Sequence, residues 1–132
     1  MHITALHHAG LSVSDFDATC AWYADHFGFA PEAEWSAGDT RIAILAAGDV
    51  RLEIFSHPGA APGPDETGDL RDSFARRGWK HVAFAVPDFD AAVTALEAAG
   101  LPLLAGPATA PAGYRYAFVR DPDGHHVEIV GD

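Results

Sequence analysis

The feature that most constrains the fold of this chain is an internal repeat. The segment HAGLSVSDFDA at residues 8–18 returns 73 residues later as HVAFAVPDFDA at residues 81–91. A second pair, LEI at residues 52–54 and VEI at residues 127–129, is separated by 75 residues. Each repeat therefore carries one histidine near its start and one glutamate near its end, and the chain is predicted to be built from two similar modules.

The length of the chain limits how independent these modules can be. Halves of about sixty residues bury too little surface to be stable alone, so we expect them to share a core within one domain over residues 1–132. We place the first module at residues 1–57 and the second at residues 78–132. Residues 58–77 between them are rich in proline and glycine and read as a linker or a loop over a pocket.

Hydrophobic periodicity predicts the same element order in each module. A strand comes first, a helix follows, and three short strands complete the module, an α+β arrangement of type βαβββ. Asp15 and Asp88 read as the residues that cap the two helices. In the first module the helix is predicted at 15–27 and the strands at 3–13, 33–36, 41–46 and 51–56. In the second the helix is predicted at 88–99 and the strands at 80–86, 101–105, 114–120 and 126–130, with a short helix at 70–77 before them.

Charge and composition exclude several classes of partner. The formal net charge is −11 with only eight Lys and Arg residues, so we expect no basic surface for nucleic acid or for an anionic membrane. No apolar run approaches the length of a membrane span. The N-terminus has neither a basic start nor an apolar stretch after it, so we expect no secretion signal. Cys20 is the only cysteine, which rules out an intrachain disulfide and suits a reducing cytoplasm.

Four side chains at equivalent positions of the repeat are candidate metal ligands: His8, Glu53, His81 and Glu128. We expect each to sit centrally in an apolar strand, where a carboxylate is costly to bury unless it is paired or coordinated. Any one of them alone would read as an ordinary core histidine or a solvent-facing glutamate. Their joint recurrence favours one divalent metal ion. Two imidazoles and two carboxylates suit Zn, Ni, Fe, Mn or Co.

The motifs of the chain resemble those of the vicinal oxygen chelate superfamily. The pattern H-x-x-x-x-V-x-D opens each repeat, L-E-I-F ends the first at residues 52–55, and D-P-D-G-x-x-x-E closes the second at residues 121–128. This superfamily includes glyoxalase I, methylmalonyl-CoA epimerase, extradiol dioxygenases, and the fosfomycin and bleomycin resistance proteins. The resemblance covers nearly the whole chain. It implies two tandem βαβββ modules whose sheets form a metal-binding cleft, and it implies a homodimer that acts on a small-molecule substrate.

The resemblance carries one expected activity and two alternatives. Short bacterial glyoxalase I enzymes have a ligand at each of the four positions, so Glu53 favours a lyase or isomerase that acts through a metal-stabilised enediolate. Either Glu53 or Glu128 is then the catalytic base. The first alternative is an Fe(II) extradiol-type oxygenase that uses His8, His81 and Glu128. The second is a metal-free drug-binding resistance protein with Trp22, Trp35 or Trp79 as stacking surfaces.

The sequence also points to side chains around the expected metal site. His126 lies two residues before Glu128 and shares its face. It would act as a second base or as a hydrogen-bond partner of the metal ligands. The alternative is that it is a turn residue facing solvent. Arg51 shares the face of Glu53 and would bind an anionic substrate group or pair with an acid at the sheet edge. Tyr114 and Tyr116 share a face, and one of them would line the pocket or pack in the core.

Overall fold

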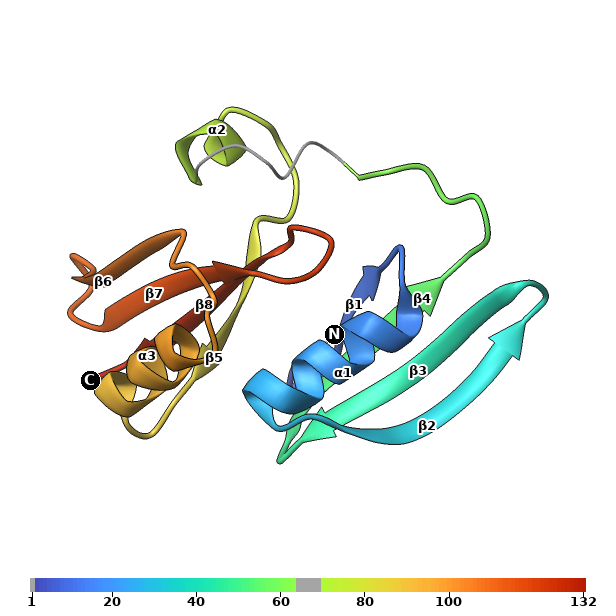
Figure 1. Ribbon diagram of the computed structural model, residues 1–132, viewed down its shortest axis with the longest axis horizontal. Coiled ribbons are helices and arrows are strands. Elements are labelled where there is room, and N and C mark those ends of the chain that lie inside the picture. Colours follow the sequence, from blue (N-terminus) through green and yellow to red (C-terminus); the bar gives the residue numbers. More distant parts are fainter. Residues whose placement is uncertain (1, 64–69) are drawn as a thin grey trace. The chain divides into compact units, whose positions relative to one another are not determined.

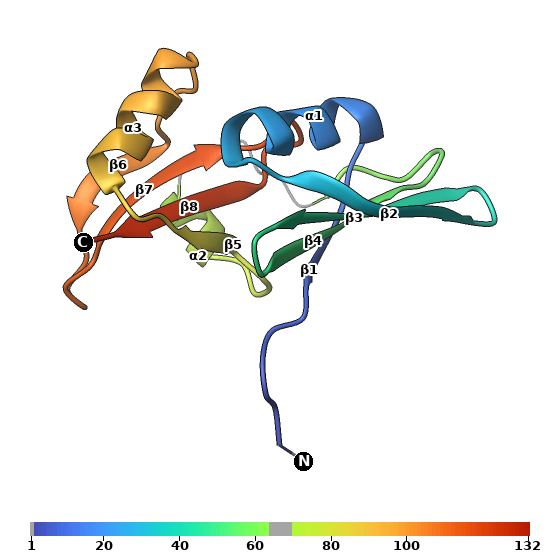
Figure 2. The same ribbon diagram turned by 90° about the horizontal axis from the view of Figure 1, so that it is seen from below.

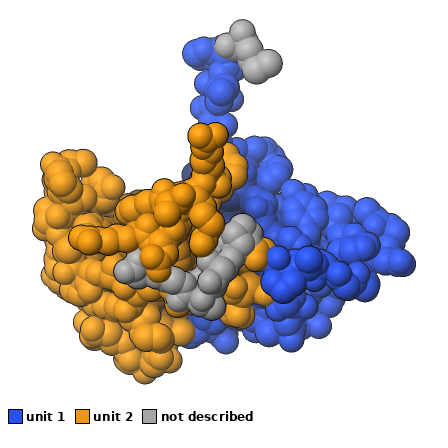
Figure 3. Space-filling view, turned by 90° about the horizontal axis from the view of Figure 1, so that it is seen from above, with its two compact units in different colours: residues 1–62 blue, residues 63–132 orange. Residues whose placement is uncertain are grey.

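The computed structural model describes residues 2–63 and 70–132, which form two compact units (Figures 1 and 3). Unit 1 spans Met1–Pro62 and unit 2 spans Gly63–Asp132. The predicted linker therefore lies partly outside the described residues, at positions 64–69. In the described part, no helix is long and apolar enough to cross a membrane.

Unit 1 has the predicted βαβββ order. It contains β1 (Ala9–Ser12), α1 (Phe16–Phe27), β2 (Ala30–Ala37), β3 (Thr40–Ala47) and β4 (Val50–Ser56). The sheet order is β1-β4-β3-β2, with β1 parallel to β4 and the other neighbours antiparallel. Figure 2 shows α1 along one face of this sheet and the N-terminal residues leaving β1 on the opposite side.

Unit 2 repeats this order after a short helix, α2 (Leu70–Phe74). The repeated elements are β5 (His81–Ala85), α3 (Phe89–Ala98), β6 (Ala105–Thr109), β7 (Arg115–Arg120) and β8 (His126–Gly131). The sheet order β5-β8-β7-β6 matches that of unit 1 strand for strand, with β5 parallel to β8. The predicted α+β fold with two βαβββ modules is confirmed.

Three strand predictions were wrong in their extent. The strand predicted at 33–36 extends over Ala30–Ala37. The first predicted strand covered residues 3–13, but only Ala9–Ser12 forms β1. Its ladder partner β4 begins at Val50, so the residues before Ala9 have little strand to pair with, and Ile3 and Leu6 are exposed. The strand predicted at 101–105 is displaced to Ala105–Thr109. The apolar residues before Ala105 connect α3 to this edge strand, where the irregular register after Ala105 accommodates Pro107.

The repeated D-F-D motif begins each helix. The carboxylates of Asp15 and Asp88 accept hydrogen bonds from the backbone N–H groups of Ala18 and Ala91, at 3.0 and 2.9 Å. These bonds confirm both residues as helix caps. Gly28 ends α1 in the left-handed conformation, at φ 69°, where glycine has no steric penalty.

The phenylalanine and the second aspartate of the D-F-D motif make the same contacts in both units. In unit 2, Phe89 is buried under the guanidinium of Arg115, which lies 4.5 Å from the ring centre and forms an ion pair with Asp90. In unit 1 the same contacts join Arg41, Phe16 and Asp17, with Arg41 3.9 Å from the ring centre. The repeated motif therefore serves the packing of a helix on its sheet.

Candidate functional site

In unit 1 the structure brings His8 and Glu53 together. The Nε2 atom of His8 lies 3.1 Å from Oε2 of Glu53. Leu52 and Ile54 are fully buried on the face of β4 that contacts α1, so alternation directs Glu53 to the opposite face. Gly10 stands opposite Glu53 in the parallel ladder, and a Cβ at Gly10 would lie 3.9 Å from the carboxylate. The absent side chain leaves that carboxylate open on the side of β1.

Unit 2 repeats the pair with His81 and Glu128. Their Nε2 and Oε2 atoms lie 3.0 Å apart. Val127 and Ile129 are buried on the face of β8 that contacts α3, so Glu128 lies on the other face, as Glu53 does in unit 1. The side chain of Glu128 is 7% exposed, against 19% for Glu53. Burial raises the pKa of Glu128, and the nearby His81 opposes this shift without cancelling it.

The expected position of the histidines at strand centres was wrong. His8 precedes β1 by one residue, and His81 is the first residue of β5. Both imidazoles are about one-third exposed, at 39% and 33%. In the parallel ladders, the partners of Glu53 and Glu128 are Gly10 and Ala83. Each histidine lies two residues before the partner of its glutamate, so it shares that partner's face and reaches the glutamate diagonally. Each pair is therefore a diagonal contact between parallel strands.

The donor atoms of each pair are compatible with a shared metal ion. Ligand bonds of about 2.1 Å hold two donor atoms about 3.4 Å apart at the tetrahedral angle and about 3.0 Å apart at the right angle of octahedral coordination. Both separations match the right angle. The same distance suits a direct hydrogen bond between the two side chains. Between residues 2 and 63 and from 70 onward, no group of three or more His, Cys, Asp or Glu side chains is gathered for a metal. The four predicted ligands are thus seen as two pairs, one in each unit.

The other predicted site residues have varied surroundings. Arg51 forms a bidentate ion pair with Glu32 of β2, and both hydrogen bonds to the carboxylate are 2.7 Å long. His126 is 3% exposed within β8 and is paired in register with His81, so it is not a solvent-facing turn residue. Tyr114 is exposed just before β7, whereas Tyr116 is half-buried within it.

Phe118, a residue that the sequence did not single out, is adjacent to the unit 2 pair. Phe118 stands opposite Glu128 in the antiparallel ladder, and its ring contacts the imidazole of His81 edge-on, with centroids 5.2 Å apart. Tyr116 continues this row, at 5.8 Å from Phe118. The signal was present in the alternation of β7, because Phe118 shares the face of Tyr116.

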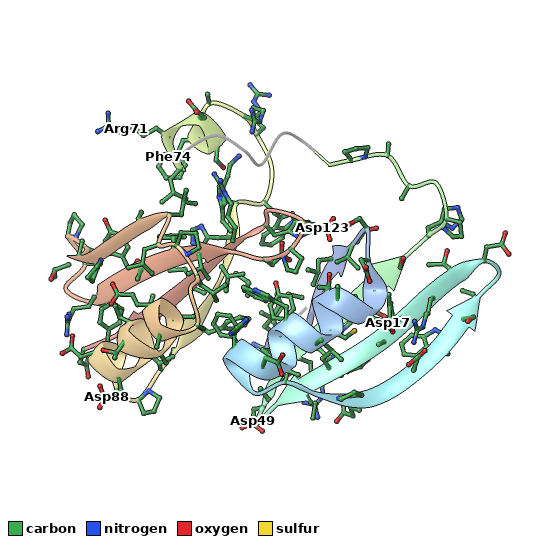
Figure 4. The ribbon with its side chains drawn as sticks, in the orientation of Figure 1. Asp17, Asp49, Arg71, Phe74, Asp88 and Asp123 are labelled. Carbon is green, nitrogen blue, oxygen red and sulfur yellow. The ribbon has the colours of Figure 1, made fainter. Side chains whose placement is uncertain are left out.

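Two further histidines also have close partners. The Nδ1 atom of His7 lies 2.8 Å from Nδ1 of His8, so one of the two rings donates to the other. His125 holds the buried carboxylate of Asp121 through Nδ1 at 2.8 Å, and Asp121 also accepts from the backbone N–H groups of Asp123 and His125. This second arrangement fixes the turn between β7 and β8 (Figure 4 labels Asp123 there).

Comparison with known proteins places the chain in a family. Residues 5–129 match the Glyoxalase/Bleomycin resistance protein/Dioxygenase superfamily, and the chain belongs to it. Its relatives include the uncharacterised protein YaeR of Escherichia coli (strain K12), 30% identical over 94% of this chain and 93% of YaeR. The uncharacterised protein YwkD of Bacillus subtilis (strain 168) is also 30% identical, over 98% of each chain.

Solved structures show the same fold. A glyoxalase family protein from Enterococcus faecalis aligns with a TM-score of 0.80 at 24% identity, over 98% of this chain and 99% of that one. At this level of identity the likeness concerns the fold alone. Function must therefore be argued from the side chains of this chain.

Proposed function

We propose that this protein is a divalent-metal-dependent enzyme of the glyoxalase I type, a lyase or isomerase acting on a small substrate with vicinal oxygens. The observation that carries the proposal is the duplicated pair of His and Glu side chains, with donor atoms 3.1 and 3.0 Å apart in the two units. His8, Glu53, His81 and Glu128 would hold the ion, which is Zn, Ni, Fe, Mn or Co. When bound, the ion would supply a Lewis acid that polarises a substrate carbonyl.

In this proposal the protein supplies the base. Glu128 takes the proton from the carbon next to the carbonyl and returns it to the neighbouring carbon. In the metal-free protein, burial raises the pKa of Glu128, so a Glu128 carboxylate that leaves the ion to accept the proton would be a stronger base than an exposed one. Glu53 is the alternative base. Comparing Glu128→Gln with Glu53→Gln separates the two roles, because only loss of the base abolishes exchange of the substrate proton with solvent while the substrate still binds.

The first experiment is metal analysis of the purified protein and of the variant His81→Ala. We expect the variant to lose most of the bound metal, because it removes one of the four donors. His26→Ala is the matched control, since His26 lies in the last turn of α1 beside Trp22, outside both pairs. Metal content in His81→Ala equal to that of the wild type would refute the four-ligand assignment.

The second experiment assays the metal-loaded protein against three substrate panels. These are hemithioacetals, epimerisable acyl-CoA thioesters and catechols. Turnover in either of the first two panels, with proton exchange at the reacting carbon, supports the proposed reaction. A metal-loaded protein that turns over none of them refutes the proposed substrate range.

One observation favours a second candidate, an Fe(II) oxygenase that uses His8, His81 and Glu128. Phe118 and Tyr116 form a row of aromatic rings beside His81, and such a row suits a catechol-like ring. Anaerobic reconstitution with iron, followed by oxygen-electrode measurements with catechols, separates the candidates. Oxygen uptake that persists in Glu53→Gln would favour the oxygenase.

We also propose that the protein is a homodimer, as its resemblance to the superfamily implied. The exposed Ile3 and Leu6 of the N-terminal segment are apolar surface that a second copy would cover. Light scattering during size-exclusion chromatography measures the mass directly. A mass equal to the 14.0 kDa of one chain would refute the dimer.

A further inference from the structure

Half of the basic side chains lie in one short stretch of unit 2. Residues 70–80, called here the basic segment, contain α2 and the connection to β5. They hold four of the eight Lys and Arg residues, namely Arg71, Arg76, Arg77 and Lys80. We expected no basic surface from the net charge of −11. The basic segment holds one acid, Asp72, against these four cations, so it carries a local excess of positive charge within a chain whose total charge is negative.

Two arginines of the basic segment differ from three arginines of the sheets. Arg41, Arg51 and Arg115 each bind a carboxylate, with contacts of 2.7 Å. Arg71 and Arg77 are exposed, and neither forms an ion pair with any residue in the ranges 2–63 and 70–132. Within the described structure, their charge is therefore available to an anion from solution.

Lys80 holds α2 next to the start of β5. Its Nζ donates to the carbonyl oxygen of Ser73, at 2.7 Å, and to that of Arg76. These bonds hold the end of α2 against the residue that immediately precedes β5. Because His81 begins β5, the basic segment is tied to the start of the strand that carries one member of the unit 2 pair.

The basic segment also exposes two large aromatic side chains. Trp79 is fully exposed and Phe74 is 65% exposed. Figure 4 shows Phe74 and Arg71 on α2, with Arg71 extending away from the helix. Exposed aromatic rings beside arginines that form no ion pair within residues 2–63 and 70–132 suit a ligand that combines an apolar or aromatic body with a negative charge.

The length of chain between these residues and His81 limits their separation. An extended chain spans at most about 3.6 Å per residue, so the Cα of Trp79 lies within about 7 Å of the Cα of His81. By the same limit the Cα of Arg77 lies within about 14 Å. Trp79 and Arg77 therefore lie within the length of one small molecule from His81.

We propose that the basic segment binds the anionic end of the substrate, and that the substrate is an organic anion with an apolar body between its charge and its vicinal oxygens. Arg71 and Arg77 bind the charged group, and Trp79 contacts the apolar body. This inference rests on the proposed function, which places the reacting oxygens beside His81 and Glu128. A small anion suits the segment better than a nucleic acid, because the net charge of −11 repels a long polyanion.

The test separates charge from vicinal oxygens with three probes. Catechol has vicinal oxygens without charge, cinnamate has charge without vicinal oxygens, and caffeate has both. Binding of each probe to the full chain loaded with Zn²⁺ is measured by calorimetry. The variants are the double substitution Arg71→Gln with Arg77→Gln and the charge-preserving control Arg71→Lys with Arg77→Lys. All four changes are at exposed positions.

We expect caffeate to bind the wild type more tightly than catechol. The glutamine double variant should weaken caffeate about tenfold, roughly threefold for each exposed charge, and change catechol by less than twofold. The lysine double variant should retain most of the affinity for caffeate. Raising the salt concentration should weaken caffeate and leave catechol unaffected.

Other outcomes overturn either the inference or its premise. Equal affinity for caffeate and catechol, or no effect of the glutamine double variant on caffeate, refutes the inference and leaves the proposed function intact. Cinnamate binding as tightly as caffeate, with the same loss in the glutamine double variant, supports the anion site and counts against the proposed function. If that variant instead turns a dimer into a monomer with unchanged probe affinity, the basic segment is an interface between two copies and the inference is wrong. Failure of all three probes to bind overturns both.

Discussion

The Nε2 atom of His81 lies 3.0 Å from Oε2 of Glu128, in a contact that crosses diagonally between two parallel strands. The first unit forms the same contact at 3.1 Å, but its surroundings differ. Phe118 stands opposite Glu128 in the ladder, whereas Ile44 stands opposite Glu53. Glu128 is also the more buried of the two carboxylates. The two copies of the pair are therefore similar in geometry and different in environment, so substitutions in them should have different effects.

The buried carboxylate of Glu128 should make the stability of the metal-free protein fall with rising pH. Its pKa is raised in the folded state by burial, so the folded protein binds more protons than the unfolded chain over the interval between the two pKa values. The contribution of Glu128 to the free energy of unfolding is therefore fully present below the ordinary pKa of glutamate. It is lost as the pH rises through the raised pKa of the folded state. Urea unfolding in the presence of a chelator, at a series of pH values, measures this effect.

The variant Glu128→Gln isolates the contribution of the carboxylate. It removes the ionisation and keeps the shape, so its stability relative to the wild type should increase as the pH rises through the same interval. A stability difference between the two proteins that stays constant from acid to neutral pH would contradict the raised pKa of Glu128. Metal should reverse the order, because a ligating carboxylate is favoured in its charged form.

Phe118 should influence the metal site through His81. The variant Phe118→Leu keeps an apolar side chain and removes the edge-on ring contact with the imidazole. Such aromatic contacts are worth about 0.5–1.5 kcal/mol, so we expect the affinity for Zn²⁺ to fall about two- to tenfold. Competition against a chromophoric chelator measures that affinity.

Phe84→Leu is the matched control for Phe118→Leu. Phe84 lies on β5 three residues after His81, and the alternation of the strand places it on the opposite face of the sheet. It is buried to a similar degree as Phe118. Equal losses of Zn²⁺ affinity in the two variants would show that the effect reflects general loosening of unit 2 and not the contact with His81.

The fold could be predicted because the repeat contains the necessary signals twice. Asp15 and Asp88 each precede a helix, and a strand precedes and three strands follow each one. The extent of the strands was harder to predict, since it depends on partners distant in the sequence. The apolar residues before Ala105 read as a strand, yet pairing with β7 begins only at the end of that run.

The candidate site was predictable in its members and less so in their environment. The equivalent positions of His8, Glu53, His81 and Glu128 in the repeat were enough to select them. The alternative that Arg51 pairs with an acid at the sheet edge is what the structure has, but the sequence did not identify that acid as Glu32, because the ion pair joins residues on two strands that are not neighbours in the sheet. Such contacts depend on side-chain reach across the surface, which neither the spacing nor the periodicity of a sequence records.

The buried phenylalanine of the repeated motif should be important for stability. Phe89 is 3% exposed and begins α3, so Phe89→Ala should lower the free energy of unfolding by about 3–5 kcal/mol. Phe89→Leu retains most of the volume and should cost less than about 1.5 kcal/mol. Urea denaturation of both variants, followed by circular dichroism, measures the difference. A loss below about 1 kcal/mol for Phe89→Ala would contradict the role assigned to the motif.

Cys20 should react slowly with thiol reagents in the native protein. Burial on α1 raises the pKa of its thiol, Asp17 and Glu34 raise it further, and Arg41 opposes them. A raised pKa means that less of the reactive thiolate is present at neutral pH, so alkylation by iodoacetamide at pH 7.5 should be several-fold slower than in the chain unfolded by urea. The rate should climb with pH to a midpoint above that of the unfolded chain, because the native thiol ionises later. Mass spectrometry of samples taken over time measures both rates, and the Cys20→Ser variant identifies any label on other side chains. A native protein that is alkylated as quickly as the unfolded chain at pH 7.5 would contradict the burial of this thiol.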